Sequence, residues 1–402
     1  MDKLRGEPYM AGDRFLLIKP WSYRLWSDVE HVLGQLLIAE ITNRIPVIYW
    51  PTHCLHNGFI HTNGFELYFE PVSNYSIFDL TKPEYTFYPP VWDADNLLVE
   101  DTCKDTWMYR SIGDLISSDA NVVIGDVYFS ISEIIPFVKK DNAAYGMTAT
   151  EIYRYLYNKY IRLKRDILME VQGFYQSWLK DGHPLLAVHV RREEDDKIID
   201  VRKDIVDEHY WRRNSRKYGT KNAKKQKIKY RFRGKAKILK ANTQYHSEIQ
   251  KLINKYAIKK IFLLTDSEEA VEEYRNMYGD MVVYTDCKRL SGSDPSYYME
   301  NPMVKRRRGI ESIKDAYLAA QCDFFIGNDF SSLSRAISRI KDWPDGNVKL
   351  LFRQREKRKY PVNVKMIVSN EKKMFQSFVK FMEKLYNKIK KKLHIGGDEN
   401  DS

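Results

Sequence analysis

A short apolar run that ends in a burst of charge most constrains how this chain folds. Residues 184–188, Pro-Leu-Leu-Ala-Val, are typical of a strand buried on both faces, and His189-Val-Arg191-Arg192 follows directly. In open α/β sheets, ligands bind beyond the carboxyl ends of the strands. Two adjacent guanidinium groups at such an end favour a diphosphate, because the planar arginine fork matches phosphate oxygens. The alternative is a surface salt-bridge cluster with the acids at 193–196.

Two later segments repeat the pattern of an apolar strand with a polar end. Residues 259–266, Lys-Lys-Ile-Phe-Leu-Leu-Thr-Asp, predict a second strand, and Ser267 then caps a helix. Residues 309–335 predict a helix, a strand, a turn at Gly327 and a further helix that begins near Ser331. Backbone N–H groups and hydroxyls at such a helix start form an anion-binding site. Three strand ends in one half of the chain therefore carry groups suited to an anion.

The three segments together resemble the short motifs of the α1,6-fucosyltransferase and nodulation fucosyltransferase family, whose superfamily includes the protein O-fucosyltransferases. The resemblance covers residues 184–340 through these motifs and 27–50 more faintly, and the third motif is the most specific. It implies an α/β fold of the GT-B type with two Rossmann-like domains. It also implies an enzyme that transfers fucose from GDP-fucose to a glycan acceptor. A transferase of the same fold that uses another nucleotide sugar is the alternative, since sugar specificity depends on pocket shape.

The resemblance also implies roles for individual residues in binding the donor. In that family, the arginine at the place of Arg191 grips the β-phosphate, and the histidine at the place of His189 contacts the nucleotide. The aspartate matching Asp315 lies near the guanine, whose paired N–H donors a carboxylate can accept. The serines of the third motif bind the diphosphate, and the arginine one helical turn later adds charge or braces the loop. The predicted donor site therefore comprises His189, Arg191, Arg192, Asp315, Ser331, Ser332 and Arg335.

The acids that follow the arginines are candidates for the base that removes the acceptor hydroxyl proton. Asp195 stands where the N-glycan enzymes of the family carry a lysine that helps the chemistry. Local spacing favours Glu194 and Asp196, so the predicted catalytic residues are Arg191, Glu194 and Asp196. The alternative is that all four acids at 193–196 only offset the positive charge of Arg191 and Arg192.

The sequence predicts a reaction without a metal cofactor. No Asp-x-Asp motif stands in the half that is expected to hold the donor, and Asp93-Ala-Asp95 lies in the other half. Arginine would then replace a metal ion in stabilising the charge of the departing diphosphate. We therefore expect a metal-independent transfer, and the resemblance to the fucosyltransferases implies that it is inverting.

The length of 402 residues predicts two domains with a boundary near residue 180. Residues 1–180 are expected to form an acceptor-side α/β domain, and residues 181–370 the domain that binds the nucleotide sugar. Within the first domain, the apolar periodicity predicts strands at 15–18, 45–50 and 121–125, a helix at 27–42 and helical structure throughout 149–180. The aromatic run at 65–92 is interpreted as a loop-rich covering of the core, with a sugar-binding groove as the alternative.

The net charge of +12 originates in one segment, since fourteen Lys and Arg and no acid lie from Trp211 to Lys240. This basic run is predicted to be an insertion at 211–240. A solvated loop, contact with a phosphorylated acceptor and contact with an anionic membrane surface are all open interpretations. Interleaved aromatic residues also fit a nucleic-acid-binding protein, but that function leaves the three strand-end motifs unexplained, so no nucleic-acid partner is expected.

The C-terminal region predicts an amphipathic helix at 371–393 and a disordered tail at 394–402. The helix fits either a return onto the first domain or an interfacial position on a membrane. The four cysteines are scattered without a Cys-x-x-Cys pair, and neither an apolar leader nor an 18-residue apolar run is present. These observations predict a cytoplasmic protein, with peripheral membrane contact as an extension of that expectation.

Overall fold

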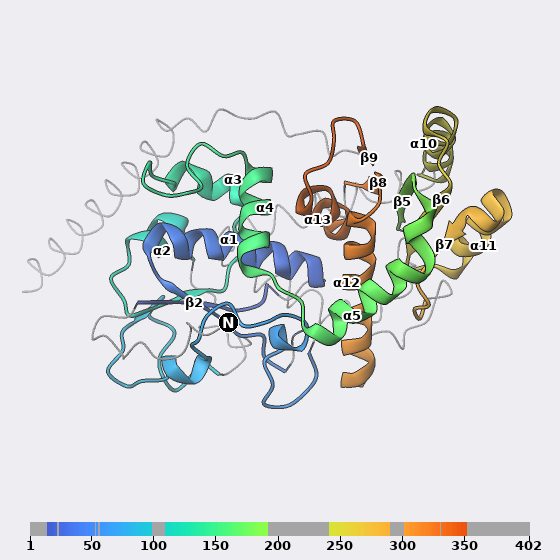
Figure 1. The fold of residues 1–402 in the computed structure, drawn as a ribbon. Coiled ribbons are helices and arrows are strands. Elements are labelled where there is room, and N and C mark those ends of the chain that lie inside the picture. Colours follow the sequence, from blue (N-terminus) through green and yellow to red (C-terminus); the bar gives the residue numbers. More distant parts are fainter. Residues whose placement is uncertain are drawn as a thin grey trace, which may run out of the picture. The chain divides into compact units, whose positions relative to one another are not determined.

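The computed structural model describes residues 14–21, 24–52, 54, 57–98, 109–191, 241–289, 301–329 and 331–351, which carry two parallel β-sheets (Figure 1). Several sequence-based expectations concern residues outside these ranges, namely those for Arg192, Glu194, Asp196, the basic run at 211–240, the helix at 371–393 and the tail at 394–402.

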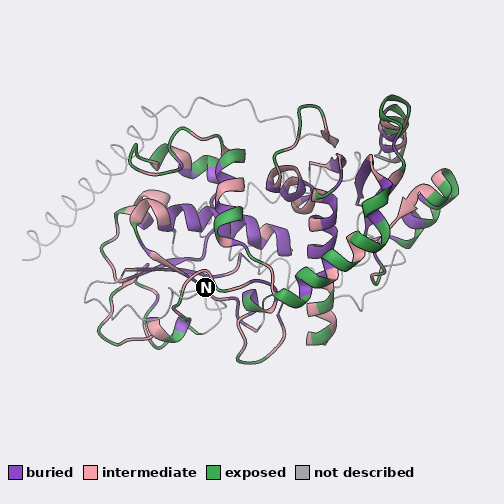
Figure 2. Cartoon of the chain, in the orientation of Figure 1, coloured by how far each residue is buried: buried purple, intermediate pink, exposed green. Residues whose placement is uncertain are grey.

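The first sheet has the strand order β2-β1-β4-β3, and every neighbouring pair is parallel. Its strands are β1 (Phe15–Ile18), β2 (Ile45–Ile48), β3 (Phe87–Tyr88) and β4 (Val122–Gly125). Helix α1 (Leu25–Thr42) connects β1 to β2 and is buried along most of its length (Figure 2). It ends at Asn43, which adopts the left-handed conformation with φ of 50°. Both strand predictions at 15–18 and 121–125 and the helix prediction agree with these bounds to within two residues.

The second sheet has the strand order β7-β6-β5-β8-β9 and is also entirely parallel. Its strands are β5 (Leu185–Val190), β6 (Lys260–Thr265), β7 (Val282–Val283), β8 (Phe324–Asn328) and β9 (Val348–Leu351). Counted from β5, this is the order 3-2-1-4-5 of a Rossmann sheet. The order reverses between β5 and β8, and ligands of such sheets bind beyond the strand ends at that point. The predicted α/β class with two Rossmann-like sheets is confirmed.

Helices cover both sheets and supply most of the remaining core. Their bounds are α2 (Ile112–Ser117), α3 (Ile131–Ile134), α4 (Ala149–Tyr160), α5 (Arg165–Phe174), α10 (Ala241–Tyr256), α11 (Glu268–Tyr278), α12 (Pro302–Ala320) and α13 (Ser332–Ile340). Buried side chains of α1, α4, α12 and α13 belong to one apolar cluster that also includes residues of both sheets. In the described ranges, no helix is long and apolar enough to cross a membrane.

The prediction of helical structure throughout 149–180 is wrong, because the chain is extended between α4 and α5. There, the Glu70 N–H donates to the Arg162 carbonyl at 2.8 Å, and the Lys164 N–H donates to the Tyr68 carbonyl at 3.0 Å. Backbone groups that would continue a helix are used in these tertiary hydrogen bonds instead. After α5 the chain continues through a wider turn, Tyr175–Leu179, before β5.

The aromatic run at 65–92 is largely part of the core, as the preferred interpretation predicted. Phe65, Tyr68 and Phe69 are at most 1% exposed and Trp92 is 3% exposed, whereas Phe78 is an exception on the surface. The ring of Tyr68 lies against Gly309 of α12, where any side chain would overlap it. The aromatic segment of the first half therefore packs directly on the helix that leads to β8.

Candidate active site

A cavity of about 480 Å³ lies beyond the carboxyl ends of β5 and β8, where the strand order of the second sheet reverses. Its volume is within the range of small-molecule sites. The structure brings five of the residues predicted from the sequence to its wall, namely His189, Arg191, Asp315, Ser331 and Ser332. These residues come from β5, α12 and the start of α13, which are far apart in the sequence.

His189 is a buried, neutral histidine whose position is set by α13. Ser334 Oγ accepts a hydrogen bond from the Asn328 N–H at 2.9 Å, so its own proton is directed to His189 Nδ1 at 2.7 Å. Burial, followed by the charges of Arg191 and Arg24, lowers the pKa of His189 to about 3. His189 therefore acts as a hydrogen-bonding group and not as a cation at neutral pH.

The start of α13 is a helix N-terminus suited to an anion, and it carries a hydroxyl without a described partner. Ser331 is the residue before the first turn, and its backbone carbonyl accepts the Arg335 N–H at 3.0 Å. The Ser331 side chain is 1% exposed, yet its Oγ has no hydrogen-bond partner among the described residues. A buried hydroxyl without a partner is costly, so a ligand that supplies one is favoured. Free N–H groups and the helix dipole at this terminus select a negative charge.

The charges around the cavity also favour an anionic ligand. Six cationic residues line it against three acids, Asp266, Glu311 and Asp315, and the cations are Arg24, Arg191, Lys288, Lys305, Arg307 and Arg308. Arg191 follows β5 directly and is half-buried. Arginine in this place can bind two phosphate oxygens at once.

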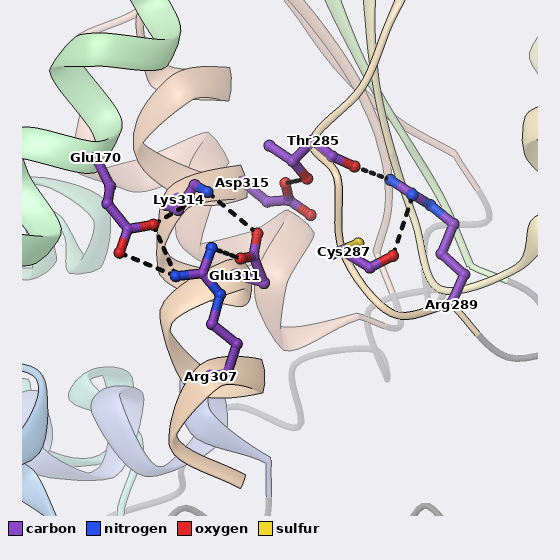
Figure 3. A network of polar contacts seen from close by, with 8 residues as sticks. All are labelled: Glu170, Thr285, Cys287, Arg289, Arg307, Glu311, Lys314 and Asp315. Atoms are coloured by element: carbon purple, nitrogen blue, oxygen red, sulfur yellow. Dashed lines mark hydrogen bonds and ion pairs between the residues drawn. The ribbon is translucent and has the colours of Figure 1, made fainter. Parts of the chain in front are cut away.

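Two carboxylates of α12 line the cavity in different electrostatic settings (Figure 3). Glu311 is paired with Arg307 and lies 3.4 Å from Lys314 Nζ, and both cations also contact Glu170 of α5. Asp315, one turn later, accepts a hydrogen bond from Thr285 Oγ1 at 2.9 Å. Burial raises the pKa of Asp315 to about 7, with a further contribution from the charge of Glu311. Asp315 is thus the less neutralised of the two acids.

The first half of the chain closes one side of the cavity through the start of α1. Arg24, Leu25 and Trp26 line it. Trp26 Nε1 donates to the Ser312 carbonyl at 3.2 Å and to Ser312 Oγ at 3.1 Å, which ties α1 to α12. Arg24 also approaches Asp266, at the end of β6, at 4.0 Å. Groups from both halves of the chain therefore face the same cavity.

Arg335 does not line the cavity, although it was predicted as part of the donor site. Its guanidinium approaches Glu30 of α1 at 3.4 Å and donates to the Asp329 carbonyl at 3.4 Å. Arg339, one turn later, lies 3.1 Å from the same Glu30 carboxylate. In this structure Arg335 braces the loop before α13 against α1, which is one of the two roles expected from its position. Its contact with a donor stays a prediction.

The Asp93-Ala-Asp95 sequence forms a turn. Asp93 Oδ1 accepts the backbone N–H groups of Asp95 and Asn96 at 3.0 and 2.9 Å. Within the described ranges, no cluster of three or more His, Cys, Asp or Glu side chains has an arrangement suited to a metal ion.

Sequence reasoning missed Arg24, Trp26 and Glu311 of the cavity wall, and also Thr285, which donates a hydrogen bond to the wall residue Asp315. Arg24 and Trp26 belong to the other half of the chain and carry no motif. Glu311 lies four residues before Asp315, and this helical spacing is the one signal that could have placed both acids on the same face.

A Rossmann-ordered sheet with a helix start suited to an anion at its switch point is typical of nucleotide-binding α/β proteins. A second parallel sheet whose first connecting helix, α1, contributes to the same cavity is the arrangement expected of a glycosyltransferase of the GT-B type. The sequence model of one family, the GDP-fucose protein O-fucosyltransferases, matches residues 39–343. The chain belongs to this family and is accordingly a GDP-fucose-dependent glycosyltransferase.

Among solved structures, the NodZ α-1,6-fucosyltransferase soaked with GDP-fucose has 17% identity and a TM-score of 0.49, covering 82% of this chain and 92% of that chain. NodZ from Bradyrhizobium, as selenomethionine protein, has 16% identity and a TM-score of 0.47, with coverage of 81% and 91%. POFUT1 in complex with GDP-fucose has 14% identity and a TM-score of 0.43, with coverage of 85% and 97%. No curated protein sequence matches this chain. The family assignment rests on the family model.

Proposed function

We propose that this chain transfers fucose from GDP-fucose to a glycan acceptor, with inversion at the anomeric carbon and without a metal ion. The observation that carries the proposal is the convergence on one cavity, at the sheet's switch point, of Arg191, Asp315 and the Ser331 hydroxyl, which has no partner among the described residues. These groups match two parts of a guanosine diphosphate donor, the diphosphate and the base. Arginine and the α13 terminus suit the diphosphate, and a buried carboxylate suits the guanine N–H groups.

In this proposal, the donor lies across the ends of β5 and β8. Arg191 binds the β-phosphate, Ser331 and Ser332 bind phosphate oxygens together with the α13 backbone, and His189 contacts the nucleotide. Arg192 adds a further positive charge. The domain division near residue 180 belongs to the same proposal, with the donor held by residues 181–370 and the acceptor approaching from residues 1–180.

Bond making and bond breaking take place on opposite faces of the sugar in an inverting transfer. The acceptor oxygen forms a bond to the anomeric carbon while the bond to the β-phosphate oxygen breaks, and that electron pair leaves with GDP. Arg191 and the α13 terminus stabilise the negative charge that develops on the diphosphate, which is the task a metal ion performs in other transferases. Glu194 or Asp196 is proposed to take the proton of the acceptor hydroxyl.

The acceptor is the part of the proposal with a specific alternative. The matching family model describes transfer to protein, which favours a hydroxyl of a polypeptide as the second candidate acceptor. Contact of the basic run at 211–240 and the helix at 371–393 with an anionic surface stays a prediction, as does the cytoplasmic location. No nucleic-acid partner is proposed.

The test is turnover with GDP-fucose in the presence of EDTA, against separate glycan and peptide acceptor libraries. We expect fucosylated glycan whose anomeric configuration, read by NMR, is opposite to that of the donor. A product with retained configuration would contradict inversion. Activity that disappears in EDTA and returns with a divalent ion would contradict metal independence, and products from peptides alone would replace the glycan acceptor with a protein.

A further inference from the structure

In the described part of the chain, the Asp315 carboxylate accepts a hydrogen bond from a side chain at only one of its two oxygens. Its Oδ1 accepts the Thr285 hydroxyl at 2.9 Å, and Thr285 itself is fully buried. Among the described residues, no other side chain forms a hydrogen bond or ion pair with this carboxylate. Asp315 lines the cavity and is 8% exposed. One carboxylate oxygen is therefore held by the protein, while the second oxygen and the remaining acceptor capacity of Oδ1 can serve a ligand.

The loop that carries Thr285 is itself held in shape by an arginine. Arg289 Nη2 donates to the Thr285 carbonyl at 2.6 Å and Nη1 donates to the Cys287 carbonyl at 3.3 Å (Figure 3). The guanidinium also lies over the Tyr284 ring, 4.9 Å from its centroid. A single planar group thus fixes the backbone on both sides of residue 286. The position of the Thr285 hydroxyl follows from this clamp.

The neighbouring acid shows that this arrangement is particular to Asp315. Glu311 lies one turn earlier on α12 and lines the same cavity, but Arg307 and Lys314 pair with it. A carboxylate paired with two cations is a weak acceptor for a neutral N–H donor, because its charge is already neutralised. The hydroxyl of Thr285 orients Asp315 without neutralising it.

We propose that Thr285 is a specificity-determining positioning residue that fixes the Asp315 carboxylate to accept the adjacent N–H donors of a guanine ring, while Arg289 holds the loop that presents it. The inference rests on the proposed GDP-sugar function. Guanine offers a ring N–H beside an exocyclic amine, which together match a carboxylate. Adenine has an acceptor at the corresponding ring position, and uracil places carbonyl oxygens on both sides of its single N–H, so both bases would meet the carboxylate with repulsive groups.

The charges that face Asp315 make this recognition dependent on pH. Burial and, to a smaller extent, the charge of Glu311 raise its pKa, the Thr285 hydrogen bond, Arg289 and Lys314 oppose this rise, and the net pKa is about 7. Cys287 also lies close by, and its own pKa is raised to about 11 by burial and by Asp315, so it is a neutral thiol at neutral pH. The ionised carboxylate accepts both guanine donors, whereas a protonated one directs a hydrogen at them. Loss of the Thr285 hydroxyl would therefore weaken guanine binding most near and below neutral pH.

The experiment is calorimetric titration of GDP and of inosine diphosphate, which lacks the exocyclic amine, between pH 6 and pH 9. Thr285→Val removes the hydroxyl and keeps the branched shape, Thr285→Ser keeps the hydroxyl, and Arg289→Gln loosens the loop. We expect Thr285→Val to weaken GDP binding about tenfold or more, as for a lost hydrogen bond to a charged group, and to reduce the preference for GDP over inosine diphosphate. The pH at which the association constant for GDP reaches half of its maximal value should also rise. Thr285→Ser should restore both properties.

Thr42→Val is the matched control, because Thr42 donates its hydroxyl to the Ile38 carbonyl at the end of α1, away from the cavity. It should leave the ratio of the two affinities unchanged. If Thr285→Val does not fold, Arg289→Gln should show the same reduced preference for GDP with a smaller loss of affinity. Suppose that the wild type binds GDP, and that the folded variants keep its ratio of GDP affinity to inosine diphosphate affinity and its pH profile of GDP binding. This result would overturn the role of Thr285 and leave the proposed donor intact. A wild type that does not bind GDP would overturn the proposed donor as well.

Discussion

The carboxyl ends of the two sheets use their polar residues in opposite ways. At the first sheet, Asp126 follows β4 and is 1% exposed, and the Arg110 guanidinium binds it through Nε at 2.9 Å and Nη2 at 2.6 Å. Trp92 Nε1 donates to the same carboxylate at 3.2 Å, and Lys19 Nζ, after β1, lies 3.6 Å from the centre of the Trp92 ring. At this edge, the Asp126 carboxylate is satisfied by neighbouring side chains.

At the second sheet, the corresponding edge faces a cavity. We call this edge the open edge, and the carboxyl end of the first sheet the closed edge. Arg191 lines it, the Ser331 hydroxyl is buried without a described partner, and Asp315 keeps one oxygen open. The parallel topology is shared, so topology alone does not make a site. The difference shows that a ligand site is marked by buried polar groups that the protein itself does not satisfy. Such groups lower the stability of the empty protein.

Arg191 should give the largest effect at the open edge. Arg191→Lys should raise the barrier of the transfer by on the order of 3 kcal/mol, because a compact ammonium cannot reproduce the two-point contact with a phosphate. The measurement is kcat/KM for the donor, with the melting temperature as the control for folding. Near-normal kcat/KM would make Arg191 a structural residue and weaken the contrast between the two edges.

Asp126 is the matched acid at the closed edge, and its replacement should affect stability alone. Asp126→Asn leaves the buried Arg110 without its counter-charge and should lower the free energy of unfolding by about 3 kcal/mol. The affinity for GDP, measured well below the melting temperature, should be unchanged. A large loss of affinity with normal stability would show that the first edge is also a ligand site.

Asp315→Asn should have the opposite consequences to Asp126→Asn. An acid whose pKa is raised in the folded protein contributes stability that is present at low pH and is lost as the pH rises through the raised value, here about 7. The neutral asparagine has no such loss, so at pH 8 the empty variant should be more stable than the wild type by about 2 kcal/mol. This difference should vanish near pH 4, while GDP affinity falls at pH 8. Denaturant titrations at both pH values check the prediction, and a variant less stable than the wild type at pH 8 would refute it.

The smallest effects are expected from replacing two serines, Ser331 just before α13 and Ser334 within it. The two variants distinguish a loss of ligand binding from a loss of stability. Ser331→Ala removes a hydroxyl without a described partner, so stability should hold while GDP affinity falls about tenfold. Ser334→Ala removes the hydroxyl bonded to His189 and Asn328 and should cost about 1 kcal/mol of stability. Equal losses of stability in both variants would mean that Ser331 is structural too.

The open edge could be predicted from the sequence where an apolar run changes to polar residues, since that change shows where a buried strand leaves its sheet. His189, Arg191 and Ser331 were found in this way. Thr285 carries no such signal, because β7 spans only Val282–Val283 and the role of Thr285 arises from its packing against α12.

Tertiary contacts also explain the other failures of prediction. The interruption between α4 and α5 depends on hydrogen bonds to residues 68–70, which local periodicity does not contain. The sequence likewise does not distinguish the closed edge from the open one. Asp126 follows an apolar strand just as His189 ends one, and only the positions of Arg110 and Trp92 show that Asp126 is already satisfied.

The most direct test of the open edge as a donor site is calorimetric titration of the wild-type protein with GDP and with UDP at pH 8 in EDTA. The cavity's arginine, serines and open carboxylate predict a 1:1 complex with GDP and an affinity for UDP at least about tenfold weaker, because uracil cannot offer paired N–H donors to Asp315. Binding of UDP as tight as that of GDP, or no binding of GDP without a divalent ion, would contradict the account.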